Sequence, residues 1–140
     1  MNDSRILIVG DDDLITASLS ILLKEAGFES QIAPSITAGC AAARSGAFQV
    51  VFTTATSEDG SWRRLTDIAR QYGLGFLVIL VAANVDFEHC VAAQEEGAFD
   101  VLDPLHELSR TAESAKCALW AAYLMGLGSC PEFARHPNAA

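Results

Sequence analysis

Three consecutive aspartates, Asp11, Asp12 and Asp13, follow the apolar run Ile-Leu-Ile-Val at positions 6–9. Carboxylates at the end of a strand can ligate a divalent cation. They can equally cap the helix that is predicted to start at residue 14 and interact with its dipole. The sequence leaves weak cation binding and helix capping open, and neither role requires catalysis.

The aspartates need a folded framework to hold them, and the chain is long enough to supply one. Its 140 residues and 14.9 kDa fit a single domain. The chain is 51% hydrophobic and 19% charged, which is typical of a packed globule rather than a disordered segment. We expect the domain to cover residues 1–125, and residues 126–140 to form a flexible tail or the start of a linker.

The charge of the chain argues against several kinds of partner. The formal net charge is −9 and the only adjacent basic pair is Arg63 and Arg64, so we expect no direct binding to nucleic acid or to anionic lipid.

No apolar run reaches the roughly 18 residues needed to span a bilayer, and the N-terminus does not read as a secretory signal. The four cysteines contain no Cys-x-x-Cys pair of the kind that binds zinc. These features predict a cytoplasmic protein with no contact to a membrane.

Strand-like and helix-like segments alternate along the chain. Apolar segments that predict strands lie at 5–9, 28–33, 48–54, 76–82 and 99–102, and helical spacing of apolar residues predicts helices at 14–26, 36–45, 86–96 and 106–124, with a further helix after Asp59 and Gly60. Ser35 is the expected N-cap of the second helix. The run at 76–82 is the most apolar and is typical of an inner strand that is covered on both faces.

This alternation predicts an α/β fold. Short connections and right-handed crossovers favour a doubly wound, five-stranded parallel sheet of the flavodoxin-like (βα)5 type, with strand order 2-1-3-4-5. In such a sheet the carboxyl ends of the strands meet at one edge, which is where this fold places its ligands.

Four segments carry a resemblance to a known family. They are Ile-Leu-Ile-Val-Gly-Asp-Asp-Asp at 6–13, Leu-Leu-Lys-Glu-Ala-Gly-Phe at 22–28, Asp-Gly at 59–60 and Gly-Ala-Phe-Asp-Val-Leu-Asp-Pro at 97–104. Over residues 5–124 the chain resembles the CheY-like receiver domains of bacterial two-component response regulators. The resemblance implies phosphorylation of an aspartate at the end of the third strand, with Mg²⁺ held by carboxylates after the first strand. It also implies a lysine after the fifth strand that neutralises the charge of the phosphoryl group.

The chain departs from this pattern at the acidic positions. The first acidic position of the family falls on Gly10, whereas Asp11 falls on the second, the direct metal ligand, and Asp12 on the variable third. Thr54 stands where the phosphoacceptor aspartate belongs. A neutral hydroxyl therefore replaces the nucleophile, and no adjacent His or Lys is available to activate it.

The chain also departs at the positions that would sense a phosphoryl group. The serine or threonine that ends the fourth strand in the family is represented by Ala82, and the reporting aromatic residue of the fifth strand by Val101. The family's Lys-Pro pair is represented by Asp103 and Pro104, so an anion stands in place of the cation. The resemblance thus implies a receiver fold without the parts of the phosphate relay.

The acidic residues that remain predict a pocket with little chemistry. We expect Asp11, Asp12 and Asp103 to converge at the carboxyl edge of the sheet without a lysine among them. Mg²⁺ would bind there weakly at best, through Asp11, and no cofactor would be required. Thr54 is expected to bond to nearby backbone rather than to serve as a phosphosite. These residues do not predict an enzyme.

The last predicted helix has more apolar residues near its end than one packing seam can use. Trp120, Tyr123 and Leu124 are the expected interaction surface, and the resemblance favours a homodimer through this helix. The alternative is that these residues cover the sheet and anchor a linker.

The combined hypothesis is a pseudo-receiver that works as a phosphorylation-independent, protein-binding signalling module. One alternative is a phospho-accepting receiver that uses Mg²⁺ and a displaced carboxylate such as Asp11 or Asp59. A second alternative is a small flavodoxin-like ligand binder, which the aspartates after the first strand disfavour because they would repel an anionic cofactor.

Overall fold

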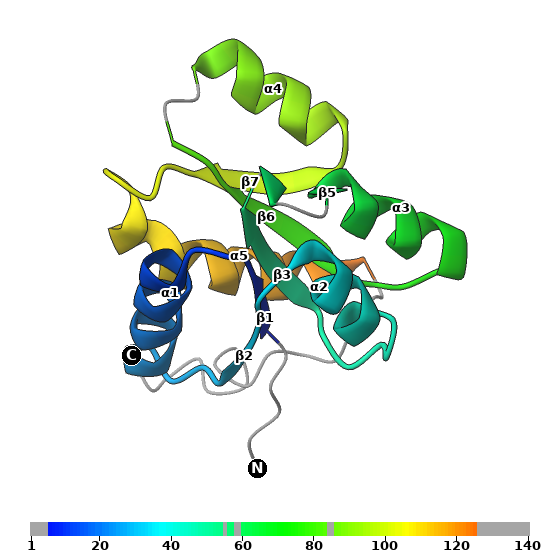
Figure 1. The fold of residues 1–140 in the computed structure, drawn as a ribbon, viewed down its shortest axis with the longest axis horizontal. Coiled ribbons are helices and arrows are strands. Elements are labelled where there is room, and N and C mark those ends of the chain that lie inside the picture. The colour runs from blue at the N-terminus through cyan, green and yellow to red at the C-terminus, as the bar shows by residue number, and fades with distance from the viewer. Residues whose placement is uncertain (1–5, 55, 58–59, 84–85, 126–140) are drawn as a thin grey trace.

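A computed structural model describes residues 6–54, 56–57, 60–83 and 86–125 of the chain. Five strands form one parallel sheet in the order β2-β1-β3-β6-β7 (Figure 1). Their bounds are β1 (Ile6–Val9), β2 (Ser30–Ala33), β3 (Val50–Thr54), β6 (Leu77–Val81) and β7 (Ala98–Leu102). Because β6 and β7 are the fourth and fifth strands of this sheet along the chain, the predicted order 2-1-3-4-5 is confirmed.

Helices cover both faces of the sheet (Figure 1). The helices are α1 (Asp13–Glu25), α2 (Ile36–Ala43), α3 (Arg63–Tyr72), α4 (Phe87–Glu95) and α5 (Thr111–Leu124). One hydrophobic cluster joins α1 and α5 to the sheet around the fully buried Phe52. A second cluster joins α2, α3 and α4 to the opposite face, where Val51 is equally buried. The core therefore has two layers separated by the sheet.

Local sequence signals account for where the first two helices begin. Asp12 and Ser35 have extended backbone conformations, and their side chains accept hydrogen bonds from the first free N–H groups of α1 and α2. In α1 the side chains of Leu19 and Leu23 are buried, which is the spacing expected of one helical face. The predicted cap at Ser35 is confirmed, with its hydroxyl 3.1 Å from the nitrogen of Ala38.

Strand β6 is covered on both faces, as its apolar sequence predicted. Val78 and Leu80 lie in the α2–α3–α4 cluster, whereas Ile79 and Val81 lie in the α1–α5 cluster. The neighbouring edge strand β7 contains an irregularity that the sequence did not reveal. The register passes from Val78 opposite Ala98 to Ile79 opposite Asp100, so one extra residue is inserted in β7.

The start of the last helix differs by several residues from the sequence prediction. The last helix was expected from residue 106, but α5 begins at Thr111 and is preceded by the short 3₁₀ helix η1 (Leu108–Arg110). The N–H of Leu105 donates to Asp103 and the N–H of Asp103 donates to Glu107, and these hydrogen bonds hold the segment in turns before α5 begins. The segment after β3 forms a two-stranded hairpin of β4 (Thr56–Ser57) and β5 (Gly60–Ser61), whose strands the sequence did not predict.

Candidate functional site

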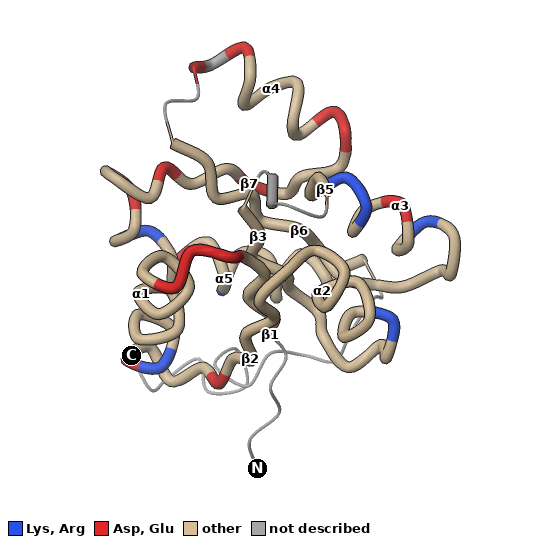
Figure 2. Tube along the Cα trace, in the orientation of Figure 1, with Lys and Arg blue, Asp and Glu red and all other residues tan. Residues whose placement is uncertain are grey.

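The candidate site is the carboxyl edge of the sheet, where β1, β3 and β7 end. Figure 2 shows a run of acidic residues at the start of α1, directly after β1. The Oδ1 atom of Asp12 accepts hydrogen bonds from the N–H groups of Leu14 (3.0 Å) and Ile15 (3.3 Å). Asp12 therefore caps α1, which is one of the two roles that the sequence allowed.

Gly10 and Thr54 lie against each other at this edge. A Cβ atom built on Gly10 would lie 3.0 Å from the Cγ2 methyl of Thr54 and 3.2 Å from the Cγ2 methyl of Thr16. Both distances are shorter than ordinary contacts between carbon atoms. A side chain at position 10 would therefore require these two methyl groups to shift by a few tenths of an ångström.

The hydroxyl of Thr54 has no hydrogen-bond partner in the described part of the chain, although its oxygen is buried. The expectation that Thr54 bonds to nearby backbone is therefore wrong. The neighbouring Thr53 makes such a bond instead, because its hydroxyl donates to the carbonyl oxygen of Thr54 at 3.0 Å. A buried hydroxyl without a partner has lost its hydration without compensation.

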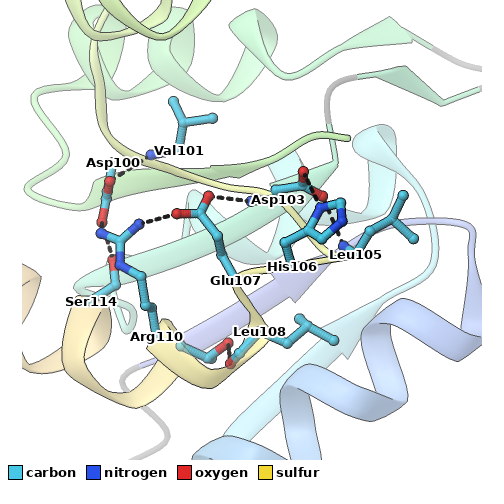
Figure 3. A network of polar contacts seen from close by, with 10 residues as sticks. Asp100, Val101, Asp103, Leu105, His106, Glu107, Leu108, Arg110 and Ser114 are labelled. Atoms are coloured by element: carbon cyan, nitrogen blue, oxygen red, sulfur yellow. Dashed lines mark hydrogen bonds and ion pairs between the residues drawn. The ribbon is translucent and has the colours of Figure 1, made fainter. Parts of the chain in front are cut away.

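Asp103 stands immediately after β7, and its carboxylate is engaged locally (Figure 3). One oxygen accepts from the N–H of Leu105 at 2.8 Å, and the other lies 3.1 Å from Nδ1 of His106. These hydrogen bonds, that from His106 foremost, hold the pKa of the Asp103 carboxyl below its ordinary value. The anion at the family's lysine position is thus paired with an imidazole from its own loop.

The aspartates of the predicted acidic pocket differ in their surroundings. Asp12 and Asp103 both turn toward nearby backbone N–H groups, while Asp11 is exposed. Among the described residues, no three His, Cys, Asp or Glu side chains are grouped so that they could hold a metal ion. Asp11, Asp12 and Asp103 all follow strands at the same edge of the sheet. Asp59, the other carboxylate considered as a displaced acceptor, lies outside the described residues.

A second polar network follows β7 and was not found by sequence reasoning (Figure 3). Arg110 donates to Glu107 at 2.7 Å and to Asp100 at 3.3 Å. Asp100 also accepts from the hydroxyl of Ser114 at 2.8 Å. The spacing of Glu107 and Arg110 was the only local signal for this network, because Asp100 reaches Arg110 and Ser114 only after β7 packs beside α5.

This network covers N–H groups of the edge strand. The N–H of Val101 donates to Oδ1 of Asp100 at 2.8 Å, and the N–H of Asp103 donates to Oε1 of Glu107 at 3.0 Å. The bond from Asp103 and the contact with Arg110 hold the pKa of Glu107 below its ordinary value. Backbone groups that could otherwise pair with another strand are therefore occupied by side chains.

The two positions assigned to phosphate sensing are apolar and packed. Val101 is buried in the α2–α3–α4 cluster, and Ala82 packs against the same cluster. The N–H of Ala82 donates to the carbonyl oxygen of Leu102 at 2.9 Å, so this residue extends the contact between β6 and β7.

The end of α5 exposes large apolar side chains. Trp120 is 38% exposed, Tyr123 is 40% exposed and Leu124 is 74% exposed, while Ala118 and Ala122 on the same helix are fully buried. The rings of Trp120 and Tyr123 have centroids 5.8 Å apart and are tilted by 49°. The residues proposed from the sequence as an interaction surface are therefore available on the surface of this chain.

No protein-family model matches the sequence, and no curated protein matches it. The structure, in contrast, is similar to many solved receiver domains. It superposes on the signal receiver domain of a protein assigned as a LuxO repressor from Vibrio parahaemolyticus with a TM-score of 0.80 and 18% identity, covering 94% of this chain and 100% of that one.

Two further solved structures are similar. A response regulator receiver domain protein from Clostridium thermocellum gives a TM-score of 0.73 at 23% identity, with 86% of this chain and 97% of that chain covered. The beryllofluoride-activated NtrC4 receiver domain dimer gives a TM-score of 0.75 at 24% identity, with 85% and 98% covered. At these identities the likeness establishes the fold, so the chain has the fold of a response-regulator receiver domain. No helix in the described ranges is long and apolar enough to cross a membrane.

Proposed function

We propose that this chain is a receiver-type signalling domain that acts through contacts with other proteins and whose conformation is not set by aspartyl phosphate. The observation that carries the proposal is the packing of Thr54 against Gly10. On the family pattern these two positions hold the phosphoacceptor and an acidic residue of the Mg²⁺ site. Here a methyl group lies 3.0 Å from where a side chain at position 10 would begin.

The chemistry of Thr54 supports the proposal. A threonine hydroxyl becomes a nucleophile when a base takes its proton or when a metal binds it. The hydroxyl oxygen of Thr54 is buried and has no hydrogen-bond partner among the described residues. A base to activate it is therefore missing from its described surroundings, and no enzymatic step is proposed.

The electrostatics of the edge point the same way. A phosphoryl group brings negative charge that a lysine and Mg²⁺ would neutralise. The lysine position holds Asp103, and the described residues offer no three-ligand group for a cation. The residues present therefore do not fit a Mg²⁺ site of the receiver type. Mg²⁺ would bind weakly at Asp11 if at all, and the module would need no cofactor.

The exposed end of α5 supports protein binding as the mode of action. Trp120, Tyr123 and Leu124 offer aromatic and aliphatic surface of the kind that is enriched at interfaces. The NtrC4 receiver domain, which has a similar fold, is described as a dimer in its beryllofluoride-activated form. We infer that the present chain forms a homodimer, or docks on a signalling protein or output domain, through this part of α5.

The test is titration with beryllofluoride and Mg²⁺, observed by backbone amide NMR shifts and by tryptophan fluorescence. A phospho-accepting receiver domain in the same buffer serves as the positive control. We expect no saturable response from this chain up to millimolar ligand. A saturable, Mg²⁺-dependent response that Asp11→Asn abolishes would overturn the proposal.

That second outcome would favour the alternative function, a receiver that is phosphorylated on a displaced carboxylate. The observation behind this alternative is that Asp11 is exposed and makes no hydrogen bond to the described residues. Mass spectrometry after incubation with acetyl phosphate and Mg²⁺ separates the two functions, because only the alternative adds a phosphoryl group to the chain.

A further inference from the structure

A cavity of about 250 Å³ lies at the end of the sheet opposite the candidate site. Phe76 and Val78, at the start of β6, contribute to its lining and are both buried. Ala69 and Leu74, from α3 and the loop after it, contribute further apolar surface. The cavity is open to solvent on one side and has room for a small ligand.

The cavity lies between α3 and the turn that precedes β7. Thr66 of α3 and Gly97 of that turn also line it. Next to them, Arg63 of α3 forms an ion pair with Glu96, with Nε of the arginine 2.6 Å from Oε2 of the glutamate. This ion pair ties the end of α4 to α3 beside the cavity.

Arg70 also lines the cavity, and its side-chain contacts differ from those of the other arginines in the described ranges. The other four are engaged by a carboxylate, a hydroxyl or an aromatic ring: Arg63 by Glu96, Arg110 by Glu107 and Asp100, Arg64 by Thr37, and Arg44 by the ring of Tyr72. For Arg70 no hydrogen bond, ion pair or ring contact to the described residues is found. Arg70 is exposed at the mouth of the cavity, so its guanidinium is accessible to a ligand in a chain with a net charge of −9.

We propose that this cavity binds a small apolar monocarboxylate, with its hydrocarbon part against Phe76, Val78 and Ala69 and its carboxylate on Arg70. Ligand sites are typically concave and mostly apolar, with a few polar groups that set the orientation of the ligand. A guanidinium matches a carboxylate with two parallel N–H···O bonds, which are stronger than neutral hydrogen bonds. The site is at the amino ends of β6 and β7 and does not depend on the proposed function.

A simpler role for Arg70 is electrostatic support of its own helix. Arg70 lies in the last turn of α3, where a cation interacts favourably with the helix dipole. Lys24 occupies the same place in α1, on the other face of the sheet, and lines no part of this cavity. Lys24→Gln is therefore the matched control, because it removes the same charge from an equivalent helix position.

The experiment is an NMR titration of the full chain with hexanoate and with hexanamide, its uncharged counterpart. We expect hexanoate to shift the amide signals of residues 66–78 and 97, and hexanamide to bind about tenfold or more weakly, as loss of a charge-assisted hydrogen bond predicts. Arg70→Gln should weaken hexanoate binding by a similar factor and leave hexanamide unchanged. Lys24→Gln should change neither affinity.

A third variant tests the cavity itself. Ala69→Leu adds bulk at its wall and should abolish binding of both probes, while a thermal unfolding curve checks that the variant is folded. The proposal is overturned if hexanoate gives no saturable shift in the wild type, if the shifts map elsewhere, or if Arg70→Gln and Lys24→Gln have the same effect on hexanoate.

Discussion

The Cγ2 methyl of Thr54 lies 3.0 Å from the position where Gly10 would carry a Cβ atom. Gly10 directly follows β1 and Thr54 ends β3, so the contact joins neighbouring strands at the carboxyl edge of the sheet. The two residue types suit each other, since the glycine leaves room for the threonine.

We expect Gly10→Ala to lower the free energy of unfolding by about 1–3 kcal/mol, the usual cost of overpacking. Thr54→Ser removes the methyl group at 3.0 Å and should recover part of this loss, although the Thr16 methyl at 3.2 Å remains. Urea unfolding of the wild type, both single variants and the double variant measures the coupling as a double-mutant cycle. If Gly10→Ala cost the same with and without the Thr54→Ser substitution, the contact would not be the cause.

Removal of the cap of α1 should destabilise the domain. Asp12→Ala leaves the N–H groups of Leu14 and Ile15 without their side-chain acceptor, which typically costs about 1 kcal/mol. Chemical unfolding followed by far-UV circular dichroism measures this change. Asp11→Ala is the matched control, because it removes the neighbouring exposed carboxylate, and it should stay within about 0.5 kcal/mol of the wild type.

The contribution of Glu107 to stability should depend on pH. Its pKa is lowered in the folded chain from an ordinary value of 4.5, by the N–H of Asp103 and then by Arg110. A carboxyl with a lowered pKa stabilises the folded state above its ordinary pKa, and this contribution is lost as the pH falls through the lowered value. Glu107→Gln should therefore be less stable than the wild type at pH 7, and the difference should shrink below about pH 4.5.

Urea unfolding at a series of pH values checks this prediction. Glu25→Gln, which removes an exposed carboxylate at the end of α1, is the control. A constant difference between Glu107→Gln and the wild type across the acid range would show that the ionised carboxylate contributes nothing.

The dimer proposed through α5 should depend on the apolar side chains near the end of that helix. We expect Trp120→Ser combined with Leu124→Ser to convert the dimer to a monomer in light scattering coupled to size exclusion. Ile21→Ser is the control, because Ile21 is an apolar residue that is 59% exposed on another helix, α1. A wild type that is monomeric at every concentration would contradict the proposed dimer.

Sequence reasoning predicted the sheet well because its signals act over short distances along the chain. The five strands, their order, the cap at Ser35 and the two-sided burial of β6 follow from apolar periodicity and from local hydrogen-bonding residues, whereas the cap at Asp12 was one of two roles left open for the three aspartates. Boundaries were less certain. The segment after β7 had helical spacing, yet the bonds from Leu105 to Asp103 and from Asp103 to Glu107 hold it in turns before α5 begins.

The sequence by itself determined which residue types stand at the edge of the sheet: a glycine at position 10, a threonine at 54 and an aspartate at 103. Only the tertiary structure decided how they interact. The methyl groups beside Gly10 come from residues that are distant in the chain, and Arg110 reaches Asp100 across the bulge in β7. The hydroxyl of Thr54 is buried without a described partner, which also follows only from the packing around it. Such contacts depend on how strands and helices pack in three dimensions, and this packing leaves no periodic pattern in the sequence.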